Sequence, residues 1–193
     1  MKHAAIAALT LLMVAGVGAA QTAPIVSGEA TAHVWVDVVA NIAVGVVTPN
    51  VDIGQVASGQ FPATVIFRID ANMESVLITI IATDLYKGDD PESEWIIPVA
   101  TGSGVGATVQ PTNANPMQGH SDVLVWESEA MLNGMAAQQS ETWAFESCQN
   151  GHFSQDVAVT IPYIQADPEL PKGEYSGFVR IIAELAVDGQ PGT

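Results

Sequence analysis

The stretch His33-Val-Trp-Val-Asp-Val-Val-Ala-Asn-Ile-Ala-Val-Gly-Val46 decides the fold, because every even-numbered residue in it is apolar. Successive side chains of an extended chain point to opposite faces, so this alternation predicts a β-strand with one apolar face. The run is longer than the ~3 to 10 residues of an ordinary strand. We therefore expect either a bend near Asn41 and Gly45 or a first half that leaves the domain and pairs elsewhere.

The residues before this stretch have the pattern of a secretory signal peptide. A short basic start, Met1-Lys2-His3, is followed by an apolar segment at 4–17 and by the small residues 18–20. The apolar segment is shorter than the ~20 residues that span a bilayer as a helix. We expect a signal peptide at 1–20, an N-terminal arm at 21–40, a single domain at 41–193, and secretion to the cell surface or beyond.

The mature chain is strongly acidic. Once Lys2 has left with the signal, four Lys and Arg residues remain against 21 Asp and Glu, which gives a formal charge of −17. Such a surface repels phosphate backbones and anionic lipid head groups, so we expect no nucleic-acid partner. Because no later segment is long and apolar enough to span a bilayer, we also expect no membrane insertion.

Further segments of alternating polarity are separated by clusters of Gly, Pro, Asn and Asp. Many short strands with such turns are typical of an antiparallel β-sandwich, so we predict an all-β, immunoglobulin-like or pilin-like fold. Residues 76–82 are apolar on both faces and suit a central strand. The expected strands are 63–71, 76–82, 95–100, 105–110, 123–126, 142–146, 157–163 and a long last strand at 175–187.

One segment has the composition of a helix. Residues 127–140 are rich in Ala, Met, Leu, Gln and Glu, which favour helix, although Asn133-Gly134 interrupts the run. We expect a short helix or a mobile connection there.

Cys148 is the only cysteine, so no intrachain disulfide can form. One Cys with the nearby His152 is too few ligands for a closed zinc site. A structural or free thiol is the expectation, and an interchain disulfide is an alternative.

Four acids lie close together in Gly88-Asp-Asp-Pro-Glu-Ser-Glu94. Their carboxylates could bind calcium, a hard cation that takes several oxygen ligands. A solvated acidic turn is the alternative interpretation. The candidate calcium ligands are Asp89, Asp90, Glu92 and Glu94.

No catalytic motif is present. A Gly-x-Ser-x-Gly elbow, a His-Glu-x-x-His pair and a phosphate-binding glycine loop are all missing from the sequence. We therefore expect that the protein is not an enzyme, with a sandwich hydrolase as a remaining alternative. Exposed tryptophans could stack on sugars, although burial of one or two in the core is the commoner outcome. The tryptophans are Trp35, Trp95, Trp126 and Trp143.

Two short motifs carry a resemblance to known proteins. The segment Pro49-Asn-Val-Asp-Ile-Gly-Gln-Val-Ala-Ser-Gly59 is similar to a glycine-containing segment of secreted fimbrial β-sandwich subunits. Leu170-Pro-Lys-Gly-Glu-Tyr-Ser-Gly-Phe-Val179 resembles the entry to the last strand of those subunits. The order of leader, early strand and these motifs resembles spore-coat-U-like and other donor-strand pilins over most of the mature chain.

The resemblance implies a filament subunit with an incomplete sandwich, which is filled by the N-terminal strand of the neighbouring copy. The partner would then be the protein itself, with a secretion chaperone or an outer-membrane assembly machinery and a role in cell adhesion. A monomeric secreted binding module for carbohydrate or a surface ligand is the alternative. The residues expected to enter the neighbour are Val34, Val36, Val38, Ala40 and Ile42.

Overall fold

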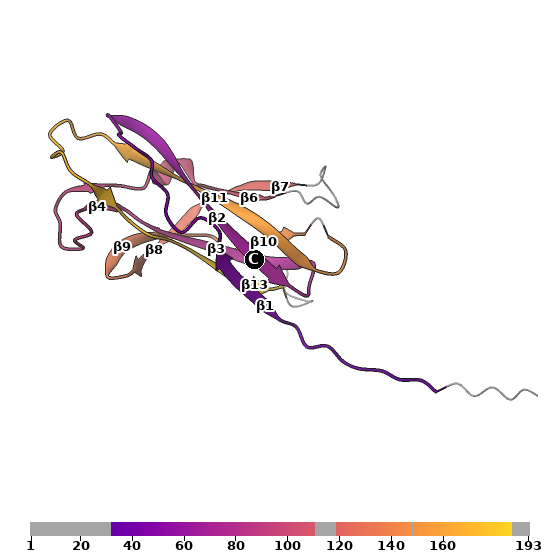
Figure 1. The fold of residues 1–193 in the computed structure, drawn as a ribbon. Coiled ribbons are helices and arrows are strands. Elements are labelled where there is room, and N and C mark those ends of the chain that lie inside the picture. Colours follow the sequence, from indigo (N-terminus) through magenta and orange to yellow (C-terminus); the bar gives the residue numbers. More distant parts are fainter. Residues whose placement is uncertain (1–31, 111–118, 148, 187–193) are drawn as a thin grey trace, which may run out of the picture. The chain divides into compact units, whose positions relative to one another are not determined.

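The computed structural model describes residues 32–110, 119–147 and 149–186, and it is built almost entirely of antiparallel β-strands (Figure 1). The chain divides between Asp37 and Val38, and all the strands belong to the second unit. This unit is an antiparallel β-sandwich, which confirms the predicted fold class. The expected signal peptide and Cys148 lie outside the described residues.

Among the described residues, the first sheet has five strands and is organised around its two longest ones. Strands β2 (Gly59–Ala71) and β11 (Phe153–Gln165) pair along their whole length. Strand β1 (Ile42–Val46) pairs with β2 at one edge. On the other side, β6 (Val105–Val109) pairs with β11, and β7 (His120–Leu124) pairs with β6.

The second sheet is organised around β3 (Ser75–Thr83), which confirms the expected central strand. On one side, β3 pairs with β13 (Val179–Leu185). Its other side pairs with β10 (Trp143–Glu146) along the first half and with β9 (Met135–Ser140) along the second. Strand β8 (Trp126–Leu132) pairs with β9 farther out.

The core lies between these two sheets, because each contributes alternate residues to one buried cluster. The first sheet supplies Phe67 and Ile69, and the second supplies Ile78 and Ile80. The aromatic rings of Phe145 and Phe153 are also fully buried. Burial of apolar side chains on alternate positions is the physical reason for the period of two in the sequence.

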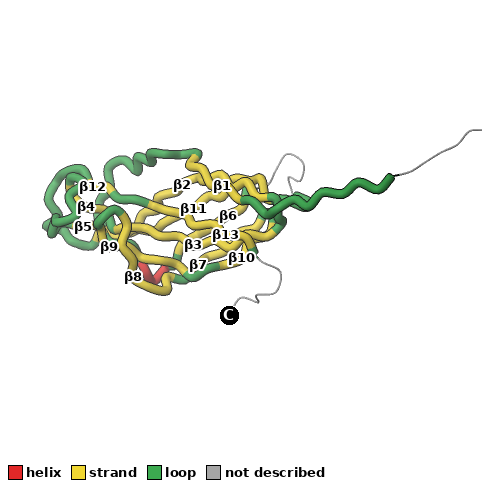
Figure 2. Tube along the Cα trace, turned by 90° about the horizontal axis from the view of Figure 1, so that it is seen from below, coloured by secondary structure: helices red, strands yellow, loops and turns green. Residues whose placement is uncertain are grey.

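A small third sheet lies at one end of the sandwich (Figure 2). It joins β12 (Tyr175–Ser176), β4 (Leu85–Lys87) and β5 (Ile96–Ile97). One turn of 3-10 helix, Thr101–Ser103, is the only helical element in the described part of the chain. It is drawn in red in Figure 2.

The expectation of a short helix or a mobile connection at 127–140 is wrong, because this segment forms the β8–β9 hairpin. Leu132 pairs with Met135, and the two residues between them, Asn133 and Gly134, have φ of 54° and 81°. Positive φ at both central residues defines the tight turn that suits the twist of a hairpin, and Asn-Gly is its preferred sequence. Pairing of β9 with β3 therefore outweighs the helix propensity of Ala, Met and Gln.

The expected long last strand is divided in two by Gly177 and Phe178. Strand β12 joins the small sheet, whereas β13 joins β3. A Cβ atom on Gly177 would lie 2.5 Å from Thr83 Oγ1 and 2.6 Å from the carbonyl oxygen of Asp84. Only glycine fits at this close approach, and the chain crosses from one sheet to the other there.

Candidate functional site

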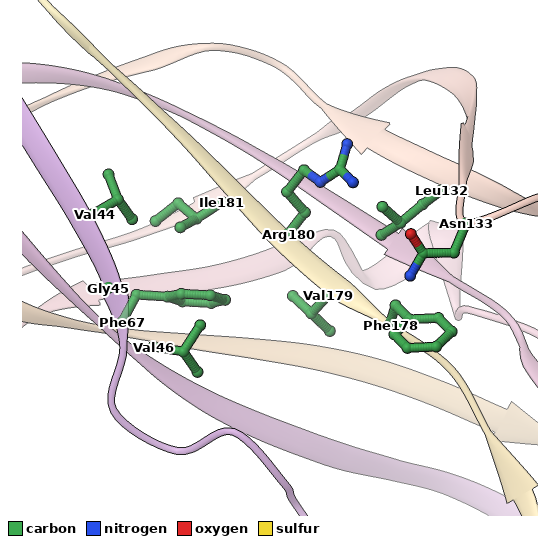
Figure 3. A pocket seen from close by; sticks show the side chains of 10 residues that line it. All are labelled: Val44, Gly45, Val46, Phe67, Leu132, Asn133, Phe178, Val179, Arg180 and Ile181. Atoms are coloured by element: carbon green, nitrogen blue, oxygen red, sulfur yellow. The ribbon is translucent and has the colours of Figure 1, made fainter.

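An open groove lies along one side of the sandwich, between the edge strands β1 and β13 (Figure 3). It has a volume of about 410 Å³. We call it the edge groove. Its lining is mainly apolar and comes from β1, β2, the turn of the β8–β9 hairpin, Phe178 and β13: Val44, Gly45, Val46, Phe67, Leu132, Asn133, Phe178, Val179, Arg180 and Ile181.

The β1 side of the edge groove contains valines that point inward without being covered. Val44 pairs with Ile69, and Val46 pairs with Phe67. Directly paired residues share a face of the sheet, and both partners are buried in the core. Val44 and Val46 nevertheless remain 43% and 56% exposed. The apolar face of the first sheet therefore continues beyond the part that the second sheet covers.

The β13 side has the same arrangement. Val179 pairs with Ala82 and Ile181 pairs with Ile80, and both β3 residues are fully buried. Ile181 is buried as well, but Val179, nearer the start of the strand, is only half-buried. The core-facing side of β13 is therefore covered less well toward the groove.

Both strands also present unpaired backbone to the groove. Residues of an antiparallel strand alternate between hydrogen bonds to one neighbour and groups directed to the other side. The amide of Val47 donates to the carbonyl oxygen of Ile66 of β2. In this alternation the N–H and C=O groups of Val44 and Val46 point away from β2, toward the groove. Likewise the carbonyl oxygen of Phe178 accepts from the amide of Thr83 of β3. The N–H and C=O groups of Val179 and Ile181 therefore point away from β3, toward the groove. Among the described residues, no strand pairs with these two edges.

The outer face of β13 carries a cation between two apolar side chains. Arg180 is exposed, and it forms no ion pair with any side chain that the structure describes. Phe178 and Ile182, which share its face, are exposed too. By contrast, Arg68 forms ion pairs with Asp70 and Asp156 at 3.1 and 3.4 Å.

The residues expected to enter a neighbour are placed in two groups. Residues 32–41 form no strand in the structure, and Val34, Val36 and Val38 are 87%, 82% and 77% exposed. Ala40 is exposed as well. Ile42 instead begins β1 and packs against the core of its own sandwich.

Asn72, at the turn after β2, holds the chain that leads into β1. Its Nδ2 donates to the carbonyl oxygen of Val39 at 2.8 Å, and its Oδ1 accepts from the amide of Asn41 at 2.7 Å. Its own amide donates to the carbonyl oxygen of Asn41 at 3.2 Å. Sequence reasoning missed this role, because a turn asparagine reveals nothing about a partner more than 30 residues away.

The four acids at 89–94 surround the turn between β4 and β5. Asp90 Oδ1 accepts from the amide of Glu92 at 3.0 Å, and Asp89 accepts from the hydroxyl of Ser176. In the described parts of the chain, no group of three or more His, Cys, Asp or Glu side chains is placed to hold a metal ion. Two of the four acids therefore have contacts that shape the turn.

A second, smaller feature lies between β7 and β10. Trp143 is half exposed, and its Nε1 donates to Asp122 Oδ2 at 3.0 Å. The same carboxylate oxygen is 2.5 Å from His120 Nε2. This arrangement fixes an indole ring at the surface beside polar groups. Among the other tryptophans, Trp126 packs against the core, whereas Trp35 and Trp95 are exposed.

No protein-family model matches this chain, and no curated protein matches its sequence. Nor does any helix in the described residues have the length and apolar character needed to cross a membrane. The edge groove is therefore the feature of the described chain that bears most on function.

Proposed function

We propose that the protein is a structural subunit of an extracellular filament or pilus, in which the arm of one copy adds a β-strand to the edge groove of the next. The observation that carries this proposal is the exposure of Val44 and Val46, which face the interior of the sandwich. An added strand with apolar side chains at alternate positions would cover them and would satisfy an open backbone edge.

The N-terminal arm has the pattern that this groove requires. Val34, Val36 and Val38 recur at every second position, the same spacing as Ile42, Val44 and Val46 of β1. In an extended arm they share one face. Burying three valines contributes roughly 5 to 9 kcal/mol before the cost of ordering the arm, at about 1.5 to 3 kcal/mol per side chain.

The contacts of Asn72 favour insertion into another copy over insertion into the same one. They hold Val39 and Asn41 against the turn after β2, immediately before β1 begins. To enter its own groove, the arm would have to reverse direction between Val38 and Ile42 and break these hydrogen bonds. Insertion into a neighbour requires neither change.

Export and assembly are part of the same proposal. A subunit with two open edges exposes apolar side chains until its neighbour arrives. The proposal therefore includes a secretion chaperone or an outer-membrane assembly machinery that covers the groove beforehand. It assigns the protein a non-enzymatic role in adhesion at the cell surface.

Replacement of Val36 with Asp should abolish filaments and leave soluble subunits, because a carboxylate would enter an apolar groove. His33→Asp is the matched control, since it introduces the same charge on the opposite face of the arm. Negative-stain electron microscopy of the mature protein, beside a variant that lacks residues 21–40, provides the readout. Filaments of normal length from Val36→Asp would refute the assignment.

A monomeric binding module is the second candidate, and Trp143 is the observation that favours it. An exposed aromatic ring fixed beside a carboxylate and an imidazole suits a sugar, which stacks on the ring and bonds to the polar groups. Glycan-array binding by a chain that stays monomeric with its arm intact would support this candidate over the filament.

A further inference from the structure

The proposed insertion leaves open how the arm finds a single register, and the inference that follows rests on that proposed function. A slip of one residue would turn the valines away from the groove. A slip of two residues would not, because Val34, Val36 and Val38 are identical and each could replace its neighbour. Such a slip changes the inward face only by bringing Ala32 or Ala40 into the place of one valine. That face alone therefore selects weakly among registers two residues apart, and the outward face has to add to the selection.

The outward face of β13 carries a distinctive sequence for this purpose. Phe178, Arg180 and Ile182 follow one another at alternate positions, so a cation lies between two apolar side chains. No ion pair with a described side chain engages Arg180. In a mature chain with only four Lys and Arg residues, an unpaired arginine at the edge of an apolar groove is available to an incoming carboxylate.

The outward face of the arm has the complementary pattern. When its even-numbered valines point inward, Trp35, Asp37 and Val39 point outward, so an anion lies between two apolar side chains. Asp37 is the only Asp or Glu between Glu29 and Asp52. The arm therefore offers one negative charge, at the centre of the segment that would be inserted.

The edge of β13 suits this arm better than that of β1. The outward-facing residues of β1 are Ala43 and Gly45, which offer no charge. In addition, Cα atoms of β1 and β13 come within 8 Å of each other. A strand that forms hydrogen bonds to both edges needs about 9.6 Å between β1 and β13, which is two inter-strand spacings. The arm is therefore expected to bond to one edge alone, and of the two edges β13 is the one that offers a charge.

We propose that Asp37 of one copy pairs with Arg180 of the next, and that this ion pair sets the register of the arm along β13. Cross-strand neighbours share a face, so this pairing brings Trp35 and Val39 next to Phe178 and Ile182, in either strand direction. It also places Val36 and Val38 beside the core-facing residues of β13. A two-residue slip would set Asp37 against an apolar side chain and Arg180 against Trp35 or Val39.

The test uses two full-length mature variants that can form only one junction. The acceptor carries Val36→Asp, which disables its arm, and the donor carries Val46→Asp, which blocks its groove. Four pairs are compared. One has no further change, one has Asp37→Arg in the donor, one has Arg180→Asp in the acceptor, and one has both reversals. Fluorescence anisotropy of the labelled donor gives the affinity of each of the four pairs, as a double-mutant cycle.

Either reversal alone should weaken the junction by about threefold to thirtyfold, because it replaces attraction with repulsion at a partly exposed pair. The two reversals together should restore the affinity to within about threefold. The unmodified pair should also lose affinity more steeply with salt than the singly reversed pairs do. Four equal affinities would overturn the register assignment and leave the filament proposal standing. Failure of the unmodified pair to bind would instead refute the filament proposal.

Cross-linking reads the register directly and separates it from a general charge effect. In a Cys148→Ser background, the donor carries Val39→Cys and the acceptor carries Phe178→Cys or Ile182→Cys. The proposal expects one of these acceptor positions to cross-link strongly. It also expects Arg180→Asp to weaken that cross-link, because the arm would then occupy registers two residues away as well. Equal cross-linking at both positions with Arg180 intact would contradict it.

Discussion

At the scale of single residues, the side chains of Val44 and Val46 point toward the core and are nevertheless exposed to solvent. Their backbone pairing turns both side chains toward the core, but about half of each remains in contact with solvent. In a sheet with one solvated face, the apolar residues occupy the covered side. The two valines therefore mark where the sandwich lacks cover.

Asp84 shows how burial affects a single charge. It is half-buried at the end of β3, and its Oδ1 accepts from the amide of Val99 at 2.8 Å. Burial raises the pKa of Asp84 above its ordinary value of 3.8, while the hydrogen bond from Val99 acts in the opposite direction. Burial also raises the pKa of the nearby Tyr163, with the charge of Asp84 as the smaller cause.

The raised pKa of Asp84 makes its contribution to stability depend on pH. The folded state holds the proton more tightly than the unfolded state, so the stabilisation is fully present below about pH 3.8 and is lost as pH rises through the folded-state pKa. Asp84→Asn keeps an oxygen for Val99 but cannot ionise. We expect the melting temperature of the variant, relative to the wild type, to be higher at pH 7 than at pH 4. Thermal unfolding at the two pH values measures this, and an equal difference at both would contradict it.

At the scale of elements, Asn72 fixes where β1 begins. Asn72→Ala removes the two side-chain hydrogen bonds to Val39 and Asn41. We expect a loss of about 1 kcal/mol of unfolding free energy, since each exposed hydrogen bond contributes at the low end of about 0.5 to 1.5 kcal/mol. Urea unfolding measures the loss, and amide exchange at Asn41 should become faster.

Asn72→Asp is the matched variant for this test. It retains an oxygen for the amide of Asn41 but loses the donor to the carbonyl of Val39. Its effect should be smaller than that of Asn72→Ala. A stability unchanged in both variants would show that Asn72 does not hold the start of β1.

The elements differ in how well the sequence predicts them. Strands β2, β3 and β11 are predictable, because alternation or a continuous apolar run reflects burial. The β8–β9 hairpin is not predictable in this way, since Ala, Met and Gln favour helix and Asn133-Gly134 then has the appearance of an interruption in a helix. In the structure it is a hairpin turn. The division at Gly177 depends on a close approach to Thr83, more than 90 residues away, which no local pattern contains.

The candidate site was predictable on one side only. Alternating valines in the arm indicate a strand that could pair elsewhere. Val44 and Val46 belong to the same alternating run as the arm valines. The sequence pattern alone therefore does not distinguish the arm, which would enter a groove, from β1, which borders one. Arg180 has the appearance of an ordinary polar position on a strand. Its place at an open edge is set by the pairing of β13 with β3.

At the scale of the whole molecule, the acidic charge limits how copies can meet. Each copy carries a formal charge of −16, which would become −17 with removal of the expected signal peptide, so random contacts between copies are repulsive. In the proposed junction, three buried valines would supply the attraction and one ion pair would supply the specificity. On the proposed function, the charge would keep free subunits apart until an arm reaches a groove.

If the arm of one copy fills the groove of another, two variants that are each defective on one side of the junction should bind each other when mixed. Val36→Asp should be monomeric with a usable groove, and Val46→Asp should be monomeric with a usable arm. Size-exclusion chromatography with light scattering should show monomers for each alone and one-to-one dimers for the mixture. A mixture that remains monomeric, with both variants folded by circular dichroism, would contradict the account.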